Sequence, residues 1–264
     1  MLFNARLAAV ARRLNRSLAA RLIRPFVDPR QALSAPRGYY HFVRDLRRYS
    51  AMPGAERIRT RDLLPQVHDR LAQSPYDPHY FFQDVWAAGL VAELAPERHV
   101  DVGSRVDYVG FLTTVTHVLF VDLRFLDVDI PRLESIRGNI LDLPFRAGTV
   151  SSLSCLHVAE HVGLGRYGDE LNPLGTQAAA RELQRVLAPG GQLLFSVPVG
   201  RARTFFNAHR VHSPRTVVDF FDELELVEFS GIDDYGAFTR HRPLDELADA
   251  SYACGLFRFR KRAP

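Results

Sequence analysis

The chain has 264 residues, of which 47% are hydrophobic and 24% charged, and its formal net charge at pH 7 is +4. This composition predicts a globular protein with a full hydrophobic core, built as one large domain with an appended arm or as two small domains. No apolar run of 18 or more residues exists, so no transmembrane helix is expected. Arginines alternate with acids beyond the N-terminal arm, which argues against nucleic-acid binding.

The cysteines, Cys155 and Cys254, form neither a disulfide framework nor a metal-ligand spacing. We therefore expect a protein of the reducing cytoplasm without a bound metal. Lys261 is the only lysine, and we attribute this strong arginine bias to a GC-rich genome rather than to a nucleic-acid partner.

Residues 1–75 are predicted to form a helical arm. Residues 1–27 contain no acid, and arginines alternate with apolar residues at helical spacing, which predicts a basic amphipathic helix over residues 2–24 that ends near Pro25. Two interpretations are open. The helix packs on its own domain or on the partner subunit of a homodimer, or it lies on the anionic inner face of a membrane. Shorter helical pieces are expected at Tyr40–Tyr49 and Arg61–Leu71.

Residues 76–264 are predicted to form the main domain, in which strands and helices alternate. An amphipathic helix over His79–Leu94 comes first, and its aromatic side chains are expected in the core. A helix near Thr176–Leu187 is expected to stop at Pro189-Gly190-Gly191. This alternation predicts a mostly parallel sheet covered on both faces, with ligands at the carboxyl ends of the strands. The other expected helices are Tyr108–Val115 and Pro214–Phe221, and the expected strands are His99–Val102, His117–Asp122, Ser135–Arg137, Val150–Leu156, Gln192–Val199, 224–232 and 252–260.

Several short motifs follow one another along this domain: an acid and a glycine at Asp101 and Gly103, an acid at Asp122, DLPF from Asp142, and ELQRVLAPGGQLLFSVP at 182–198. Together they resemble the class I S-adenosylmethionine-dependent methyltransferases over about residues 98–260. Three further segments are similar to a methyltransferase-like family of unknown function whose members often lie among surface-polysaccharide genes: Gly103–Asp107, Ser154–Asp169 and Asn207–Arg210.

The resemblance implies a Rossmann-like class I methyltransferase fold with a mostly parallel seven-stranded sheet. It also implies S-adenosylmethionine as the cofactor, and transfer of its methyl group to an oxygen of a saccharide or other small acceptor in polysaccharide biosynthesis.

The turn after the first strand lacks the G-x-G-x-x-G pattern that holds a pyrophosphate, which argues against a dinucleotide cofactor. Arg105 stands in this turn, where it either binds the methionine carboxylate of the cofactor or pairs with Asp107 to brace the turn. Asp122 lies 19 residues after Gly103, a spacing that suits a carboxylate accepting hydrogen bonds from two ribose hydroxyls. The resemblance implies that Asp142 accepts from the adenine amino group, with Leu143 beside the ring. The expected cofactor-binding residues are Asp101, Gly103, Ser104, Arg105, Asp122, Leu123, Asp142, Leu143 and Leu156.

The segment His157-Val-Ala-Glu160-His161 contains the candidate catalytic residues His157, Glu160 and His161. A histidine can accept the proton of the methyl acceptor, so His157 or His161 is the expected base, with Glu160 orienting the ring or binding a sugar hydroxyl. On a helix, the same H-x-x-E-H spacing would instead form a zinc site in which Glu160 activates water. A third hypothesis is a methyltransferase-like binding or scaffold protein without activity, which the altered glycine turn would favour.

Two later segments are the expected substrate-binding loops. The glycine-rich stretch Gly163–Pro173 has the length of a lid. Its Arg166, Tyr167 and Asp169 offer a cation, a stacking ring and an acceptor, which suit a glycan or a phosphorylated substrate. Asn207, His209 and Arg210 follow the strand Gln192–Val199 and are expected at the same cleft. In the alternative interpretation, the two loops are structural and hold each other.

Overall fold

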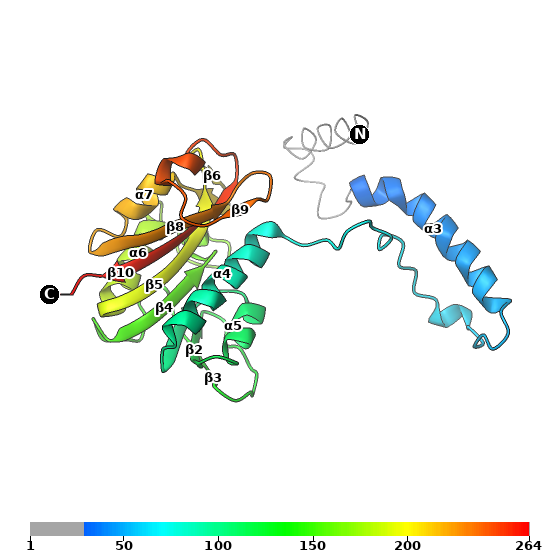
Figure 1. The fold of residues 1–264 in the computed structure, drawn as a ribbon, viewed down its shortest axis with the longest axis horizontal. Coiled ribbons are helices and arrows are strands. Elements are labelled where there is room, and N and C mark those ends of the chain that lie inside the picture. Colours follow the sequence, from blue (N-terminus) through cyan, green and yellow to red (C-terminus); the bar gives the residue numbers. More distant parts are fainter. Residues whose placement is uncertain (1–28, 264) are drawn as a thin grey trace. The chain divides into compact units, whose positions relative to one another are not determined.

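The computed structural model describes residues 29–263, and the chain divides into two compact units, Met1–Pro75 and Tyr76–Pro264 (Figure 1). The basic helix expected at residues 2–24 lies outside the described residues. Among the helices of the described part, none is both long and apolar enough to cross a membrane.

The described part of the first unit consists of one long helix followed by an extended segment. Helix α3 (Pro29–Ser50) includes the piece expected at Tyr40–Tyr49 but begins earlier. The prediction of a helix at Arg61–Leu71 was wrong, since the structure has only the short 3-10 helix η1 (Thr60–Asp62) there. Pro65 explains the difference, because it lacks a backbone N–H and disfavours the helical conformation in the residue before it.

The second unit is a Rossmann-like α/β domain around an eight-stranded sheet with the strand order β3-β2-β1-β4-β5-β10-β8-β9 (Figure 1). The first five strands in this order run parallel, and β10 lies antiparallel between β5 and β8. Its strands are β1 (Arg98–Val102), β2 (His117–Asp122), β3 (Leu133–Arg137), β4 (Val150–Leu156), β5 (Leu187–Val199), β8 (Leu224–Ile232), β9 (Phe238–Thr239) and β10 (Ala253–Lys261), and a separate hairpin pairs β6 (Arg203–Phe205) with β7 (His209–Val211). The predicted fold class is confirmed. The sheet has one strand more than expected, because the two-residue β9 pairs with the end of β8.

Helices cover the sheet on both faces, as the alternation of strands and helices predicts. One core cluster contains side chains of α6 (Gly175–Val186) and α7 (Pro214–Asp219), and the other contains side chains of α4 (Pro78–Leu94) and α5 (Val106–Leu112). Trp86 on α4 is buried in the second cluster and Phe82 packs against it, as predicted for the aromatic side chains of this helix, but Phe81 is 53% exposed. Trp86 also donates a hydrogen bond of 3.1 Å to Glu228 on β8, so a polar contact fixes the position of α4 on the sheet.

The segment Pro189-Gly190-Gly191 does not follow the end of a helix, as the sequence had suggested, but lies inside β5. Helix α6 ends at Val186, and β5 begins at the next residue. Val150 on β4 pairs with Leu187 on β5, and the next pair is Ser152 with Gln192. Two residues along β4 therefore correspond to five residues along β5, which is a shift in the pairing register. The segment that contains the proline and the glycines is therefore an irregular part of β5. Gly190 allows it, because its φ of +75° is one that other residues rarely adopt.

The parallel strands β2, β1 and β4 end at one edge of the sheet. Strands β1 and β4 are neighbours in the sheet, and the strand order reverses direction between them. The chain continues from β1 into α5 and from β4 into η2 at this edge. In open α/β sheets, such a reversal leaves a crevice at the carboxyl ends of the strands, where ligands bind.

Candidate functional site

A cavity of about 520 Å³ lies at the carboxyl ends of β1, β2 and β4. Its volume is within the range of about 300–1,000 Å³ typical of small-molecule sites. The described residues that line it are Tyr80, Gly103, Ser104, Arg105, Val106, Phe120, Asp122, Arg124, Phe125, Leu126, Leu156, His157, Glu160, His161, Arg166, Tyr167, His209 and Tyr252. All three candidate catalytic residues are among them.

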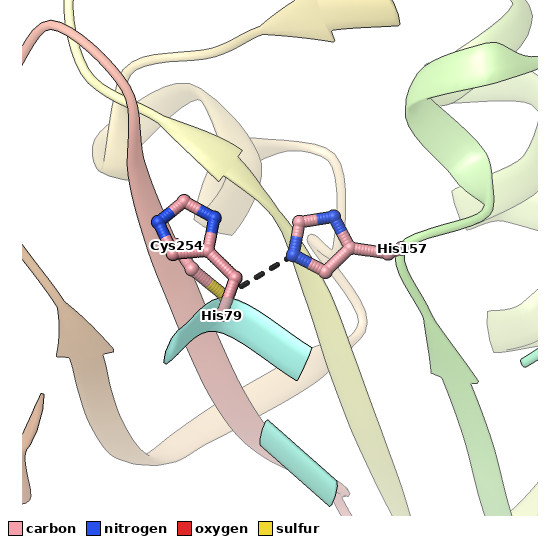
Figure 2. A group of neighbouring side chains, drawn as sticks. All are labelled: His79, His157 and Cys254. Carbon is pink, nitrogen blue, oxygen red and sulfur yellow. Dashed lines mark hydrogen bonds between the residues drawn. The ribbon is translucent and has the colours of Figure 1, made fainter. Parts of the chain in front are cut away.

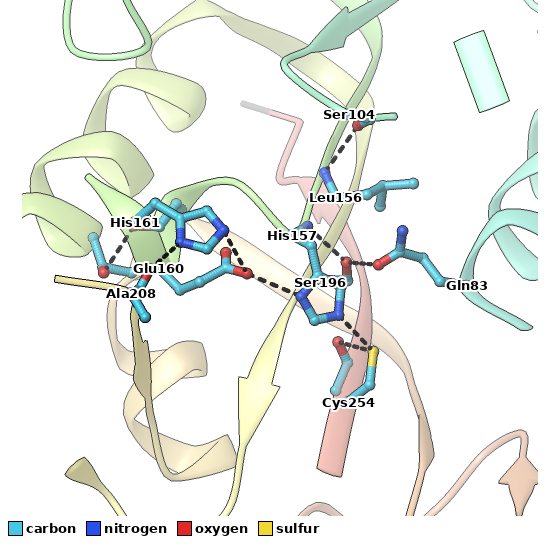
Figure 3. A network of polar contacts seen from close by, with 12 residues as sticks. Gln83, Ser104, Leu156, His157, Glu160, His161, Ser196, Ala208 and Cys254 are labelled. Atoms are coloured by element: carbon cyan, nitrogen blue, oxygen red, sulfur yellow. Dashed lines mark hydrogen bonds and ion pairs between the residues drawn. The ribbon is translucent and has the colours of Figure 1, made fainter. Parts of the chain in front are cut away.

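The turn after β1 is held by a buried carboxylate. Asp101 is fully buried and accepts hydrogen bonds from the backbone N–H (3.0 Å) and the hydroxyl (2.7 Å) of Ser104. The Ser104 hydroxyl in turn accepts from the N–H of Leu156, at 3.1 Å, and so connects the ends of β1 and β4 (Figure 3). Burial raises the pKa of Asp101 to about 6, although the hydrogen bonds from Ser104 and Ser154 oppose it. Asp101 thus shapes the turn from behind, while Ser104 lines the cavity.

Gly103 and Arg105 form the part of this turn that faces the cavity. Gly103 has a φ of +71°, and a Cβ on it would lie only 3.1 Å from Val158. Arg105 donates a hydrogen bond of 3.0 Å to Asp107, and its guanidinium lies 4.8 Å from the centre of the Tyr80 ring. The bracing contact considered for Arg105 is therefore present, while the contact with a cofactor stays a prediction.

The predicted ribose and adenine contacts lie in different places. Asp122 lines the cavity at the end of β2 and accepts a hydrogen bond of 2.7 Å from the N–H of Arg124. Leu123 is half-exposed and Asp142 is exposed, and neither is among the lining residues. Leu143 is buried in the core. The structure therefore does not bring Leu123, Asp142 or Leu143 to the cavity wall, where Phe120, Phe125 and Leu126 supply the apolar surface instead.

The candidate catalytic segment does not form the α-helix that a zinc-protease motif requires. The chain turns at His157, whose φ is +55°, and continues into the 3-10 helix η2 (Ala159–His161). In this geometry the Glu160 carboxylate lies between the histidines, with its Oε1 atom 2.9 Å from Nδ1 of His157 and 3.6 Å from Nε2 of His161 (Figure 3).

Neighbouring groups oppose the effect of burial on the pKa values of Glu160 and His157. Burial would raise the pKa of Glu160, but the hydrogen bond from His157 and the nearby histidine charges lower it below the ordinary value. Burial would likewise lower the pKa of His157, but the neighbouring Cys254 sulfur and the Glu160 carboxylate raise it above the ordinary value. The second nitrogen of His157 lies 3.3 Å from the Cys254 sulfur, so both ring nitrogens are engaged.

Two polar atoms at the cavity are left without partners among the described residues: Oε2 of Glu160 and Nε2 of His209. Burial lowers the pKa of His209 below its ordinary value. His161 is better satisfied, because its Nδ1–H donates to the carbonyl of Ala208 at 2.6 Å, which leaves Nε2 toward Glu160. Unpaired polar atoms in a buried position are costly for folding.

The predicted substrate loops divide into cavity residues and structural residues. Arg166, Tyr167 and His209 line the cavity, and the Tyr167 ring lies within 5.3 Å of the guanidinium groups of both Arg124 and Arg166. Asp169 instead accepts from the N–H groups of Gly163 (2.6 Å) and Tyr167 (3.2 Å) within its own loop.

Arg210 is also structural, because it is buried and donates to the carbonyls of Val162 (2.5 Å) and Asn172 (2.9 Å). Asn207 is exposed and is not among the lining residues. For Asp169 and Arg210, the alternative interpretation of loops that hold each other therefore describes the observed contacts.

Several residues at the site had no signal in the sequence. His79 and Tyr80 come from the first turns of α4, and Tyr252 and Cys254 come from the segment that enters β10. The rings of His79 and Tyr252 stack at 5.3 Å, and burial lowers the pKa of His79 to about 4. These residues reach the site only through the packing of α4 and β10 against the end of β4, which no local pattern reveals.

The model of one protein family matches residues 131–242, and that family is described as a Caenorhabditis protein of unknown function, DUF268. The match spans less than half of the chain and includes η2, the Gly163–Pro173 loop and His209. No curated protein sequence matches the chain.

Solved structures share the fold at low sequence identity. The cyclase SpnF is 15% identical, with a TM-score of 0.50 over 69% of this chain and 82% of that chain. The N-methyltransferase NodS from Bradyrhizobium japonicum, in complex with S-adenosylhomocysteine, is 17% identical, with a TM-score of 0.48 over 83% and 97%. A geranyl diphosphate methyltransferase in complex with GPP and sinefungin is 16% identical, with a TM-score of 0.49 over 67% and 78%. At such identities the similarity establishes the fold alone.

Proposed function

We propose that this protein is an S-adenosylmethionine-dependent methyltransferase that acts on an oxygen of a saccharide or another small polar acceptor. The observation that carries the proposal is the free oxygen of Glu160, flanked by His157 and His161, in a cavity that also holds Asp122 at the end of β2. A carboxylate for the ribose and a carboxylate–histidine pair for the acceptor thus face the same space.

The lining residues fit the proposed cofactor. One oxygen of Asp122 accepts the N–H of Arg124, which leaves the other oxygen for a ribose hydroxyl. Phe120, Phe125 and Leu126 offer an apolar wall for the adenine ring. The guanidinium of Arg105 has five N–H donors and gives one of them to Asp107, so it can also bind a carboxylate. When bound, the cofactor supplies a methyl group on a positively charged sulfur.

The chain's own residues would bind the acceptor and remove its proton. We assign Glu160 Oε2 as the acceptor of a hydrogen bond from a second, neighbouring hydroxyl of the acceptor molecule, because this carboxylate oxygen has no partner among the described residues. Nε2 of His161 then takes the proton of the hydroxyl that is methylated, since the hydrogen bond from Nδ1 to Ala208 holds the tautomer that leaves Nε2 unprotonated. Glu160, 3.6 Å away, stabilises the imidazolium that results. His157 orients Glu160, because both of its own nitrogens are engaged.

The charge at the cavity favours a substrate with hydroxyl and acidic groups. Arg105, Arg124 and Arg166 are among the lining residues, and Tyr167 lies against two of these guanidinium groups. Arginines bind carboxylates and phosphates through paired hydrogen bonds, and an aromatic ring packs on the apolar face of a sugar. An acidic or phosphorylated sugar therefore suits the site.

Calorimetry with S-adenosylhomocysteine tests the proposal. We expect the wild-type protein to bind and to unfold at a higher temperature with the ligand, because a ligand that binds only the folded state stabilises it. Asp122→Asn should weaken binding by about tenfold or more, which corresponds to about 1.4 kcal/mol. Asp129→Asn is the matched control, since Asp129 is exposed on the loop that follows Asp122 and is not among the lining residues.

If the wild-type protein shows neither binding nor a shift in unfolding temperature at millimolar ligand, the methyltransferase proposal fails. The non-catalytic binding or scaffold function would then replace it. Equal affinity of Asp122→Asn and wild-type protein would remove Asp122 from the site.

A further inference from the structure

Three potential metal ligands from distant parts of the chain meet beside the cavity: His79 in the first turn of α4, His157 after β4, and Cys254 on β10 (Figure 2). One ligand atom from each lies within 4.8 Å of the other two. Cys254 is fully buried, and the side chain of His157 is 5% exposed. We propose that these residues form a zinc-binding site.

The pair His157 and Cys254 already has the spacing of two ligands on one ion. Their Nε2 and Sγ atoms are 3.3 Å apart. Zinc binds imidazole nitrogen at about 2.0 Å and thiolate sulfur at about 2.3 Å in a tetrahedron, so two such ligands lie roughly 3.5 Å apart. The His79 ring lies nearly parallel to the His157 ring, at 17° with the centroids 6.0 Å apart, and its ligand atom lies within 4.8 Å of the other two. Because the ligand atoms of one zinc ion lie roughly 3.5 Å apart, the His79 side chain would have to turn and move by roughly 1–1.5 Å to complete the set.

Glu160 provides the outer contact that metal-binding histidines usually have. Its carboxylate accepts the Nδ1–H of His157 at 2.9 Å, so Nε2 is the ring nitrogen that faces Cys254. Such carboxylate–histidine pairs fix the tautomer of a metal ligand and increase its basicity. On binding, zinc takes the place of the single proton between Nε2 and Sγ, and that proton passes to solvent.

The same three residues, Cys254, His157 and Glu160, also have the order of a thiol nucleophile, its base and an orienting acid. The structure argues against that use, because Cys254 is fully buried and is not among the residues that line the cavity. A nucleophile must touch its substrate, whereas a metal ligand can be buried.

A zinc ion at this site would have a structural role. Three protein ligands from α4, the β4–η2 turn and β10 would hold these elements together at the wall of the cavity. His157 would then be fixed at Nε2, and through Nδ1 it would fix Glu160, which is among the residues that line the cavity. This site differs from the His157-x-x-Glu160-His161 motif, because Glu160 and His161 are not among the ligands, and it stands whether or not the protein is a methyltransferase.

Metal analysis of the full-length protein tests the inference. Protein purified without chelator should contain about one zinc per chain. After removal of the zinc, titration with Co²⁺ should produce the thiolate-to-cobalt charge-transfer band in the near ultraviolet. Cys254→Ser should abolish this band, and Cys155→Ser should retain it. Cys155 is the matched control, because it is equally buried but packs in the other core cluster and is not among the three ligands.

Histidine variants distinguish the proposed ligands His79, His157 and Cys254 from the alternative ligands of the His157-x-x-Glu160-His161 motif. We expect His79→Gln to lower zinc content and Co²⁺ affinity strongly, and His161→Gln to leave both unchanged. Wild-type protein that binds neither metal would overturn the proposal, as would a band that persists in Cys254→Ser or a loss of zinc in His161→Gln. If Cys254→Ser fails to fold, the metal content of His79→Gln provides the test, because His79 is partly exposed and its replacement disturbs the core less. Unchanged metal content in His79→Gln would also refute the site.

Discussion

The carboxylate of Glu160 is buried, but its pKa is lowered because His157 and His161 lie on either side of it. One of its oxygens is paired and the other has no partner among the described residues. A buried charge that is only partly satisfied is costly for folding. Such a cost is typical of a functional position, where a ligand completes the hydrogen bonds.

His99 shows the opposite use of a buried histidine. Its ring is fully buried, and its two nitrogens lie 2.7 Å from the hydroxyl of Ser152 and 2.8 Å from that of Ser154. Hydroxyls can serve a neutral ring as donor and acceptor, but they provide no charge to pair with a protonated one. Burial therefore lowers the pKa of His99 from 6.5 to about 3.

This shift predicts a loss of stability in acid. Because the folded-state pKa lies below the unfolded value of 6.5, the unfolded state binds more protons at lower pH. The contribution of His99 is fully present above pH 6.5 and falls by about 1.4 kcal/mol per pH unit below it. When the pH falls from 7 to 5, the wild-type protein should therefore lose about 2 kcal/mol more of its free energy of unfolding than the His99→Gln variant loses.

Urea unfolding at a series of pH values measures the difference. His117→Gln, which replaces an exposed histidine at the start of β2, is the control and should follow the wild-type curve. Parallel curves for His99→Gln and wild type would show that His99 does not contribute to the acid sensitivity.

At the scale of elements, the site depends on how two strands end. The turn after β1 needs the positive φ of Gly103, and the turn after β4 needs the positive φ of His157. The Ser104 hydroxyl joins them by accepting the N–H of Leu156. This hydrogen bond links the two turns.

Two glycine-to-alanine variants test whether the turn after β1 needs the positive φ of Gly103. Gly103→Ala should destabilise the protein by about 1–3 kcal/mol, because alanine disfavours a φ of +71° and its Cβ would lie 3.1 Å from Val158. Gly89→Ala is the matched control in the exposed face of α4, where a Cβ meets nothing within 4 Å. It should stabilise the protein by up to about 1 kcal/mol, since alanine is the better helix former. Thermal unfolding with opposite shifts for the two variants is the expected result, and shifts of the same sign would contradict it.

At the scale of the molecule, all residues that line the cavity lie between Tyr80 and Tyr252, within the second unit. We therefore propose that residues 76–264 form an independent methyltransferase-like domain and that residues 1–75 are an arm with a separate role. The basic composition of residues 1–27 keeps both a membrane surface and a partner subunit as candidates for that role.

A fragment of residues 76–264 tests this division. It should unfold in a single cooperative transition and bind S-adenosylhomocysteine with the affinity of the full chain, within about a factor of three. Circular dichroism and calorimetry on the two proteins measure these properties. A fragment that fails to fold, or that binds much more weakly, would show that the arm completes the domain.

The sequence by itself determined the order of the elements and the position of the site along the sheet. Strands β2, β4 and β8 have the predicted bounds, because an apolar run between turn residues is a local property of the chain. The same local logic placed Gly103, Asp122 and His157–His161 at strand ends, and parallel strands bring those ends together.

Only the tertiary structure decided which side chains face the cavity and which hold the loops. Asp169 and Arg210 have the same chemistry as substrate-binding residues, yet their partners are backbone groups of Gly163, Val162 and Asn172. His79 and Cys254, which are far apart in the sequence, meet at His157 because α4 and β10 pack beside the end of β4. The physical reason is that strands and turns follow from neighbours along the chain, whereas the partners of a side chain depend on register and packing between distant segments.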